Sequence, residues 1–524
     1  MVSTSWVATA GCHHTRAAKY DLAGATNHLA FGLTAGASET GRAPTAGLEK
    51  QHLPTNLRLR PFDERCMAES RLYFDRGTLV LSAPRSFAVP EQVGLRWDDR
   101  VDAFRAPAFR YRDVVAQLQC RDRDLDDVVF RGPAIAGEWS PVELRPYQQT
   151  ALMAWAQGQR GLVVLPTGSG KTRLACAAMA MCGVPTLCLV PTRALLHQWR
   201  KEIALHYRGP IGCLGDGSRA LEAITVATFE SAYRGMQRFG DRFSLLVVDE
   251  VHHFGNGVRD EALEMCAAPR RLALTATPPE GGALEPISSL MGPCVCALRI
   301  ADLSGTWLAD FECTVVGLRL TADEQKQYDH ACEVFRAVFD RFRAFSPGGR
   351  WQDFVALASR SEAGRDALAA FRASRELTTF SDAKRRAVVT LLSQHRNQRV
   401  LVFTANNASA YAIARECLIM PITCDIDRAE REQALAAFRA GELRALVSAQ
   451  VLNEGIDVPD AEVAIIVGGV RGQREHVQRV GRLLRPGPGK RALIYELVLH
   501  GTHETRKAAQ RRAALRGRGE SCAR

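Results

Sequence analysis

The sequence lacks the features that mark secreted, membrane-spanning and zinc-binding proteins. Its 15 cysteines form no CxxC pair, and most lie singly in apolar segments, so they indicate buried reduced thiols rather than disulfides or zinc ligands. No run approaches the ~20 consecutive apolar residues of a membrane span. The chain does not open with a basic segment followed by an apolar core. These absences predict a soluble cytoplasmic protein that does not contact a membrane.

The chain also has fewer acidic than basic residues. The chain has 57 Asp+Glu against 68 Lys+Arg, which gives a formal net charge of +11. Such an excess favours a polyanionic partner, but it also serves solubility alone, so charge by itself does not decide between them. The length of 524 residues exceeds one hydrophobic core and allows three or four domains.

The first 135 residues divide into two regions. Residues 1–55 are rich in Ala, Gly, Thr and Ser without a sustained period, which predicts a poorly ordered leader or a mistaken start site. In residues 56–135, Arg71–Ser82 predicts two strands joined by a turn at Asp75–Gly77, and Tyr111–Leu118 predicts a short helix. We therefore expect a small N-terminal α/β module.

Two series of short apolar runs alternate with helical segments, the first within residues 140–305 and the second within residues 385–500. Such alternation is typical of a parallel sheet covered by helices on both faces. The fold class is therefore α/β, with two parallel-sheet lobes. The predicted strands are Gly161–Leu165, Thr186–Val190, Ile224–Ala227, Leu245–Val248, Leu272–Thr275, Val400–Thr404, Ala445–Ser448, Val463–Val467 and Ala492–Leu497.

The region between the lobes and the end of the chain follow other patterns. Residues 321–384 carry aromatic side chains at helical spacing, from Tyr328 to Phe342. They predict a helical insertion whose aromatic stripe forms a core rather than a base-stacking surface. Residues 501–524 are basic, and we expect a solvated tail, with phosphate contact as the alternative.

A phosphate-binding loop follows the first strand of the first lobe. Residues 166–172 read PTGSGKT and lead into an Ala-rich helical segment. Two glycines let successive backbone N–H groups point at phosphate oxygens, and the helix N-terminus adds positive potential. Lys171 then reaches the β- and γ-phosphates, and Thr172 ligates Mg²⁺. ATP and Mg²⁺ are the predicted cofactors, and the loop residues expected to hold them are Thr167, Gly168, Ser169, Gly170, Lys171 and Thr172.

Two adjacent carboxylates end a later strand of the same lobe. Asp249 and Glu250 follow the apolar run Leu245–Val248. Asp249 fits the metal-holding role, and Glu250 fits the base that orients or deprotonates the attacking water. Such a pair at a strand end is by itself more often a helix cap. Its place after Lys171 in a strand–helix series gives it the catalytic meaning.

Phosphoryl transfer also needs positive charge against the γ-phosphate. Residues 478–485 of the second lobe read QRVGRLLR, and Arg482 and Arg485 share one face of a predicted helix. The alternative for this helix, taken in isolation, is a basic face exposed to solvent.

With these elements in order, residues 57–497 resemble the superfamily 2 DEAD/DEAH-box-like helicases, and most closely their XPB-type branch. Val251-His252-His253 continues the carboxylate pair into a form similar to the branch's DEVHH motif. The resemblance implies two RecA-like lobes with ATP between them, a damage-recognition-like N-terminal module and a thumb at the insertion. It also implies ATP-dependent movement along DNA, or unwinding of DNA, in DNA repair. One expected motif, Arg-Glu-Asp, is replaced by Pro278-Pro279-Glu280, which puts the mode of strand separation in doubt.

Further site residues follow from this resemblance alone. Arg145 and Gln148 match the segment whose Gln contacts adenine. Gly455 and Asp457 lie in the motif between ATP and nucleic acid. The motif that supplies the arginine fingers contributes Gln478, Arg482 and Arg485. The expected nucleic-acid and coupling residues are Thr192, Arg193, Thr228, Thr275, Thr277 and Thr404.

Several alternatives stay open at this stage. Within the enzyme class, these are a duplex translocase that does not separate strands and an RNA helicase. From another class comes a non-hydrolysing nucleic-acid clamp in a multi-protein complex, against which the intact Lys171, Asp249 and Glu250 argue. No paired-carboxylate nuclease cluster follows Arg485, so a nuclease or repair partner would be a separate protein.

Overall fold

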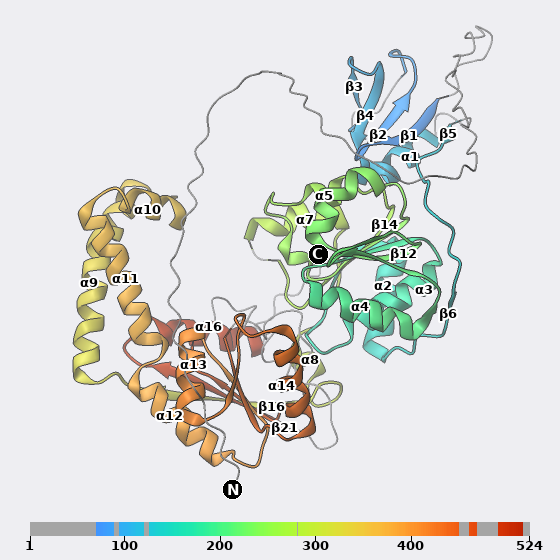
Figure 1. The fold of residues 1–524 in the computed structure, drawn as a ribbon. Helices are drawn as coiled ribbons and strands as arrows, with labels where there is room; N and C mark the ends of the chain where they lie inside the picture. The colour runs from blue at the N-terminus through green and yellow to red at the C-terminus, as the bar shows by residue number, and fades with distance from the viewer. Residues whose placement is uncertain are drawn as a thin grey trace, which may run out of the picture. The chain divides into compact units, whose positions relative to one another are not determined.

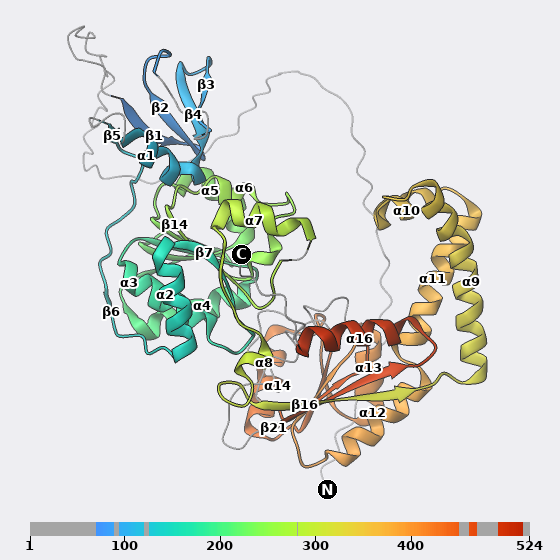
Figure 2. The same ribbon diagram turned by 180° about the vertical axis from the view of Figure 1, so that it is seen from behind.

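The computed structural model describes residues 70–87, 94–119, 125–279, 281–449, 461–468 and 491–516. They form an N-terminal module, a first lobe, a helical arm and a second lobe, whose elements are labelled in Figure 1 and seen from behind in Figure 2. Among these residues, no helix combines the length and the apolar character that a bilayer crossing needs.

The N-terminal module is a five-stranded sheet in the order β3-β4-β2-β1-β5 with one helix. Arg76 and Gly77 both have positive φ, of 49° and 90°, as the tight turn of a twisted hairpin requires. The hairpin and the short helix are as predicted. The elements are β1 Arg71–Asp75, β2 Thr78–Ser82, β3 Arg96–Asp98, β4 Ala103–Pro107, α1 Tyr111–Gln119 and β5 Asp126–Asp127.

The first lobe contains an eight-stranded sheet in the order β11-β10-β12-β8-β13-β14-β7-β15, parallel except where β11 meets β10. Its strands are β7 Arg160–Val164, β8 Thr186–Val190, β10 Ile211–Gly215, β11 Ser218–Ala220, β12 Ile224–Thr228, β13 Leu245–Val248, β14 Arg270–Thr275 and β15 Cys294–Ala297. The sequence predicted five of these strands. It missed β10, β11 and β15, which lie toward the two edges of the sheet.

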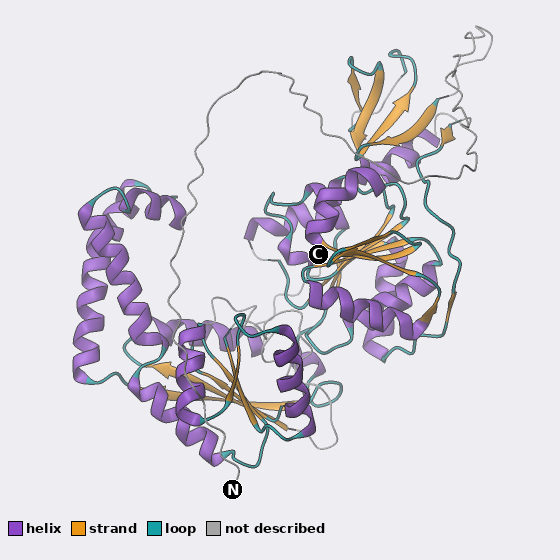
Figure 3. Ribbon diagram, viewed as in Figure 1, coloured by secondary structure: helices purple, strands orange, loops and turns teal. Residues whose placement is uncertain are grey.

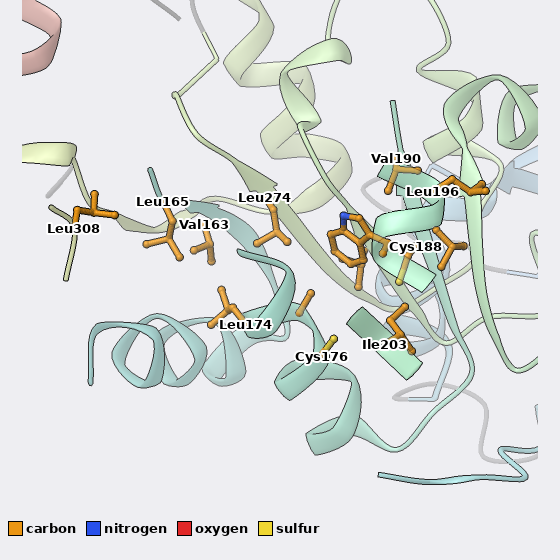
Figure 4. Close-up of a cluster of buried hydrophobic side chains, with 14 of the residues drawn as sticks. Val163, Leu165, Leu174, Cys176, Cys188, Val190, Leu196, Ile203, Leu274 and Leu308 are labelled. Carbon is orange, nitrogen blue, oxygen red and sulfur yellow. The ribbon is translucent and has the colours of Figure 1, made fainter. Parts of the chain in front are cut away.

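Alternate side chains along the central strands of the first lobe enter two separate cores. Val163, Cys188 and Val247 pack with α2, α3 and α4 on one face, whereas Leu162 and Leu246 pack with α5 and α7 on the other. Figures 1 and 3 show these helices on opposite sides of the sheet, and Figure 4 shows part of the first core. The helices are α2 Pro146–Gly158, α3 Lys171–Cys182, α4 Arg193–His206, α5 Phe229–Phe239, α6 Glu261–Glu264, α7 Leu284–Met291 and α8 Ile300–Leu303. A two-stranded sheet pairs β6 Glu138–Trp139 with β9 Tyr207–Arg208.

The second lobe is a six-stranded, all-parallel sheet in the order β16-β21-β20-β17-β19-β18. Its strands are β16 Asp310–Leu318, β17 Val400–Phe403, β18 Met420–Ile422, β19 Ala445–Ser448, β20 Val463–Ile466 and β21 Arg491–Leu499. Residues of α12 Asp382–Gln394 and α13 Asn407–Cys417 share a core with one face, and residues of α14 Arg428–Ala440 pack on the other. The predicted strands β17, β19, β20 and β21 are present.

Two features of the second lobe differ from the sequence-based expectation. The unpredicted strand β16 precedes the helical arm in the chain yet pairs with β21 over its whole length, so the arm is an insertion within the second lobe. The basic tail starts as α16 His503–Arg516, in which Glu504 and Ala508 are buried. Glu504 and Ala508 are therefore packed, whereas the basic residue Arg506 of the same helix is exposed, and the solvated tail stays a prediction.

The helical arm consists of α9 Ala322–Phe345, α10 Trp351–Ala358 and α11 Glu362–Thr379. Figures 1 and 2 both show α9 and α11 side by side. Phe342, Phe354, Ala358 and Leu368 form its buried core, and Phe335 and Phe339 pack against it. The aromatic stripe is thus a core, as the sequence predicted.

Candidate nucleotide-binding site

The loop between β7 and α3 has the conformation that a phosphate cradle requires. Gly168 and Gly170 have φ of 85° and 79°, where side chains other than glycine are strained. A Cβ at Gly170 would lie 2.5 Å from Nε2 of Gln148, so both space and dihedral angle demand glycine there. Lys171 is the first residue of α3, and its Nζ donates to the carbonyl of Leu165 at 3.4 Å.

The start of α2 is tied to this loop. Gln148 is 2% exposed, and its Nε2 donates to the carbonyl oxygens of Ser169 at 2.8 Å and Gly170 at 3.2 Å. Its Oε1 accepts from the backbone N–H of Arg145 at 2.8 Å. The Tyr147 hydroxyl also donates to the Ser169 carbonyl, at 2.7 Å. Both ends of the Gln148 amide therefore contact protein groups, so this side chain holds the shape of the loop, and its adenine contact stays a prediction.

One atom of the loop lacks a partner. Thr167 Oγ1 is buried without a hydrogen bond from any described residue, and a buried hydroxyl in this state needs an explanation. A bound nucleotide supplies one, because its phosphate oxygens accept hydrogen bonds. The two predicted metal ligands, Thr172 at the start of α3 and Asp249 after β13, offer the oxygen atoms that hard divalent cations prefer.

Both oxygens of Asp249 are held by fixed donors. Asp249 is 5% exposed. Its Oδ2 accepts from Trp199 Nε1 at 2.9 Å, and its Oδ1 accepts from the backbone N–H of Glu250 at 3.0 Å. The carboxylate thus has a fixed orientation.

Glu250 lies in a strained position next to two polar side chains. Its φ of 50° and ψ of 49° are left-handed, which is rare for a residue with a side chain and concentrates at functional sites. Oε2 of Glu250 is 3.2 Å from Nδ1 of His252, and that nitrogen is 3.1 Å from Oγ1 of Thr275. Thr275 Oγ1 donates to the Thr277 carbonyl at 2.9 Å. His252 therefore connects the end of β13 to the end of β14.

The two adjacent carboxyl groups differ in their proton affinity. Burial raises the pKa of Asp249, and the neighbouring charge of Glu250 raises it further. Burial also opposes ionisation of Glu250, but the Lys171 charge and the His252 hydrogen bond outweigh it, so the pKa of Glu250 lies below its ordinary value. Environments that push two adjacent acids apart are typical of catalytic sites.

The expected nucleic-acid residues of the first lobe cap helices. Thr192 accepts from the N–H of Leu195 at the start of α4, and Thr228 accepts from the N–H of Ser231 at the start of α5. Arg193 is exposed and lies 3.6 Å from Asp216. In the second lobe, Thr404 is fully buried, and its hydroxyl donates to the Asn406 carbonyl at 3.1 Å. Thr404 therefore supports the turn after β17 in this conformation.

Five predicted site residues lie outside the described residues: Gly455, Asp457, Gln478, Arg482 and Arg485. The structure brings together the others that surround the phosphate loop, namely Arg145, Gln148, Thr167, Gly168, Ser169, Gly170, Lys171, Thr172, Asp249 and Glu250.

Comparison with known proteins identifies the families that the chain resembles. Residues 72–129 match the model of the XPB helicase damage recognition domain, residues 141–280 that of the type III restriction enzyme res subunit, and residues 383–487 that of the helicase conserved C-terminal domain. The DNA 3'-5' translocase XPB2 of Sulfurisphaera tokodaii is 36% identical over 431 residues, which cover 80% of this chain and 96% of that protein.

This chain belongs to the XPB-type branch of the superfamily 2 helicases. Two further members are similar to it. The putative DNA 3'-5' helicase Rad25 of Halobacterium salinarum is 31% identical over 85% of this chain and 70% of that protein. The DNA 3'-5' helicase XPB of Mycobacterium tuberculosis is 29% identical over 72% of this chain and 64% of that protein. Family membership makes this XPB-type protein an ATP-dependent helicase.

Sequence reasoning missed three residues of the XPB-type site: Tyr147, Trp199 and His252. Trp199 follows Leu195 and Leu196 at helical spacing, a pattern that core packing alone explains. His252 belongs to the DEVHH-like motif, which by itself gives the histidine no role. A buried aromatic residue with a polar atom needs a hydrogen-bond partner for that atom. This requirement is the signal that could have identified these residues as more than packing residues.

Proposed function

We propose that this XPB-type protein hydrolyses Mg²⁺-bound ATP and couples hydrolysis to movement along DNA in DNA repair or related DNA metabolism. The observation that carries the proposal is the placement of Glu250 beside the phosphate loop: its pKa is lowered with the help of Lys171, and it contacts His252, which reaches Thr275. An ionised carboxylate tied to a second strand end can serve both hydrolysis and its coupling to motion.

The residues of the first lobe divide the chemistry among them. Gly168 and Gly170 shape the loop for the phosphates, and Lys171 offsets their charge. Thr172 and Asp249 hold Mg²⁺, which, when bound, neutralises charge that develops on the phosphate oxygens. Glu250, which its lowered pKa keeps ionised, orients the attacking water through a hydrogen bond and accepts the water's proton as the new phosphorus–oxygen bond forms. When the Glu250 contacts change after hydrolysis, His252 can pass the change to Thr275.

The second lobe completes the site in this proposal. Gln478, Arg482 and Arg485 approach the γ-phosphate when the lobes close on ATP, and Gly455 and Asp457 lie between nucleotide and nucleic acid. The support for these roles is the match of residues 383–487 to the helicase C-terminal domain. Because the arginines come from another lobe, hydrolysis depends on closure, which makes each turnover a step.

Two regions are proposed to contact DNA. The exposed Arg193 at the start of α4 is suited to a backbone phosphate. In the N-terminal module, a groove of about 1010 Å³ is lined by Arg96, Arg100, Arg105 and Arg110 together with Trp97. Asp98 binds Arg100 at 2.8 Å and Asp75 binds Arg105 at 2.8 Å, so Arg96 and Arg110 are the groove arginines proposed to contact phosphates. Such contacts are independent of base sequence and weaken with salt.

The test is steady-state ATP hydrolysis by the whole chain, alone and with single-stranded DNA, duplex DNA or RNA. We expect DNA to stimulate turnover and Lys171→Ala to abolish it. Lys201→Ala, which changes an exposed lysine of the same lobe, is the matched control and should retain turnover. Hydrolysis by Lys171→Ala at the normal rate would refute the site. No turnover by the natural chain with any nucleic acid would favour a non-hydrolysing clamp.

The direction and outcome of movement are further parts of the proposal. The names of the relatives, a DNA 3'-5' translocase and a DNA 3'-5' helicase, support travel from 3' to 5' on DNA. Forked duplexes with a 3' or a 5' tail report unwinding, and displacement of a third strand from duplex DNA reports translocation without unwinding. Unwinding of RNA forks but not of DNA forks would favour an RNA helicase. Displacement of the third strand without unwinding of forks would favour a duplex translocase. The missing Arg-Glu-Asp motif makes this outcome important to test.

The cellular location and the partner class of the protein are also part of this proposal. Cys176, Cys188 and Cys266 are fully buried free thiols, which supports a reducing cytoplasm. A nuclease or repair protein is the proposed partner class, since relatives include subunits named as parts of a transcription and DNA repair factor. Co-purification with and without DNA tests for such a partner.

A further inference from the structure

Trp199 contacts the metal-holding carboxylate although it lies 50 positions earlier in the chain. It is fully buried in α4. Its indole N–H, which can only donate, gives its hydrogen bond to Oδ2 of Asp249 at 2.9 Å. Most of the indole surface packs in the apolar core with Leu196 and Ile203, so the ring is fixed by packing and the N–H direction is fixed with it.

Asp249 needs such a donor because of its surroundings. It is buried, and it adjoins a second carboxylate, Glu250. A buried charge is costly unless hydrogen bonds satisfy it. The backbone N–H of Glu250 already binds Oδ1 at 3.0 Å, so Trp199 supplies the donor for the other oxygen. With one donor on each oxygen, the carboxylate is held in one orientation before any cation arrives.

We propose that Trp199 is a positioning residue for the magnesium site: its N–H holds Asp249 in the orientation that a magnesium-bound nucleotide requires. The inference rests on the proposed role of Asp249 as a metal ligand. Groups that orient a ligating carboxylate affect metal affinity by about 10- to 100-fold. Loss of the N–H should therefore weaken the magnesium-dependent part of nucleotide binding and leave the part due to the phosphate loop.

The chain offers a matched control in Trp155. This tryptophan is also fully buried and packs in the same apolar core. Its N–H donates at the same distance, 2.9 Å, but to the backbone carbonyl of Arg271. Trp155→Phe and Trp199→Phe thus remove equivalent packing and one hydrogen bond each, and only the second variant removes a donor from Asp249.

A second substitution at Trp199 separates the N–H from the ring. In Trp199→His, Nε2 of the imidazole occupies the five-membered-ring position of the indole N–H, whereas the six-membered ring is lost. Trp199→Phe keeps most of the packing and loses the N–H. The positioning role predicts that His retains more of the magnesium effect than Phe, although it fills less of the core and unfolds at a lower temperature.

The experiment is an equilibrium titration of the whole chain with a fluorescent ADP analogue, in Mg²⁺ and in EDTA, for the natural chain and the three variants. We expect the ratio of the dissociation constant in EDTA to that in Mg²⁺ to fall about 10-fold in Trp199→Phe, with the dissociation constant in EDTA unchanged. The ratio should stay normal in Trp155→Phe and recover in part in Trp199→His. Thermal unfolding without nucleotide, measured for each variant, reports the packing loss separately.

A normal magnesium ratio in Trp199→Phe would overturn the positioning role. If both affinities fall equally, the ratio is also normal, and the loss indicates damage to the fold. The failure of the proposed function looks different: if the natural chain shows magnesium-dependent binding but no DNA-stimulated hydrolysis, the motor proposal fails and Trp199 retains its role. No magnesium effect in the natural chain would overturn both.

Discussion

The two lobes share one architecture but close the turn after an equivalent strand in different ways. In the first lobe, β7 leads through Gly168 and Gly170 into Lys171 at the start of α3, and the buried hydroxyl of Thr167 has no hydrogen-bond partner within the described part of the chain. In the second lobe, β17 leads to α13, whose N-terminus is capped by Asn406: its side chain accepts from the N–H of Ser409 at 2.8 Å.

The comparison shows that a parallel sheet does not by itself make a phosphate site. Both helices start with N–H groups that lack an intrahelical partner. In α13, a side chain of the protein already accepts from one of them. At the start of α3, no side chain caps the helix, so the N–H groups remain available to an anion. Turn chemistry, and not sheet topology, distinguishes the lobe that binds the nucleotide.

The largest expected effect comes from the catalytic carboxylate of the first lobe. Glu250→Gln keeps the size of the side chain and removes its basicity, so turnover should fall by about 10²- to 10⁴-fold while nucleotide binding persists. Single-turnover hydrolysis and an ADP-analogue titration measure the two quantities. Glu261→Gln, an exposed change in α6, is the control. Turnover within a few-fold of normal in Glu250→Gln would show that another group accepts the proton.

A smaller effect should follow from adding a methyl group to the phosphate loop at Gly170. Gly170→Ala places a Cβ 2.5 Å from Gln148 Nε2 at φ +79°, and the resulting strain and displacement should weaken nucleotide binding by about 10-fold or more. Gly183→Ala is the matched control: it caps the other end of α3 at φ +58°, and its Cβ would meet nothing within 4 Å. Equal losses of affinity in both variants would mean that the loop shape is unimportant.

Coupling should be more sensitive than binding to the contact between strand ends. Thr275→Val keeps the shape of the side chain and removes the hydroxyl that lies 3.1 Å from His252. We expect DNA stimulation of hydrolysis to fall by about 3- to 30-fold, with nucleotide affinity unchanged. Thr275→Ser retains the hydroxyl and should behave normally. Full DNA stimulation in the valine variant would remove Thr275 from the coupling role.

The smallest expected effect concerns the second lobe, at the Asn406 cap of α13. Asn406→Ala removes the cap of α13, which should cost about 1 kcal/mol of local stability. Hydrogen exchange of residues 407–417 should therefore accelerate, while nucleotide affinity stays constant. Asn406→Ser preserves a capping oxygen and should exchange more slowly than the alanine variant. Altered nucleotide affinity in Asn406→Ala would show that this turn also serves the nucleotide.

The sequence predicted most of the buried strands because each is a short apolar run between turn residues. It missed β16, whose alternate residues are exposed and whose partner β21 follows some 170 residues later. The register of such distant strands depends on packing that no local window contains. The nesting of the arm within the second lobe therefore became visible only in the structure.

The sequence by itself determined the phosphate loop, the carboxylate pair and the order of the motifs, because these depend on residue type and short spacing. The tertiary structure decided which distant residues support them: Gln148 and Tyr147 on the loop, His252 between two strand ends, and Trp199 on Asp249. The physical reason is that a hydrogen bond between residues 50 positions apart, such as that from Trp199, requires both elements to be packed, and a tryptophan in a helix looks the same in sequence whether its N–H faces a carbonyl or a metal-holding carboxylate.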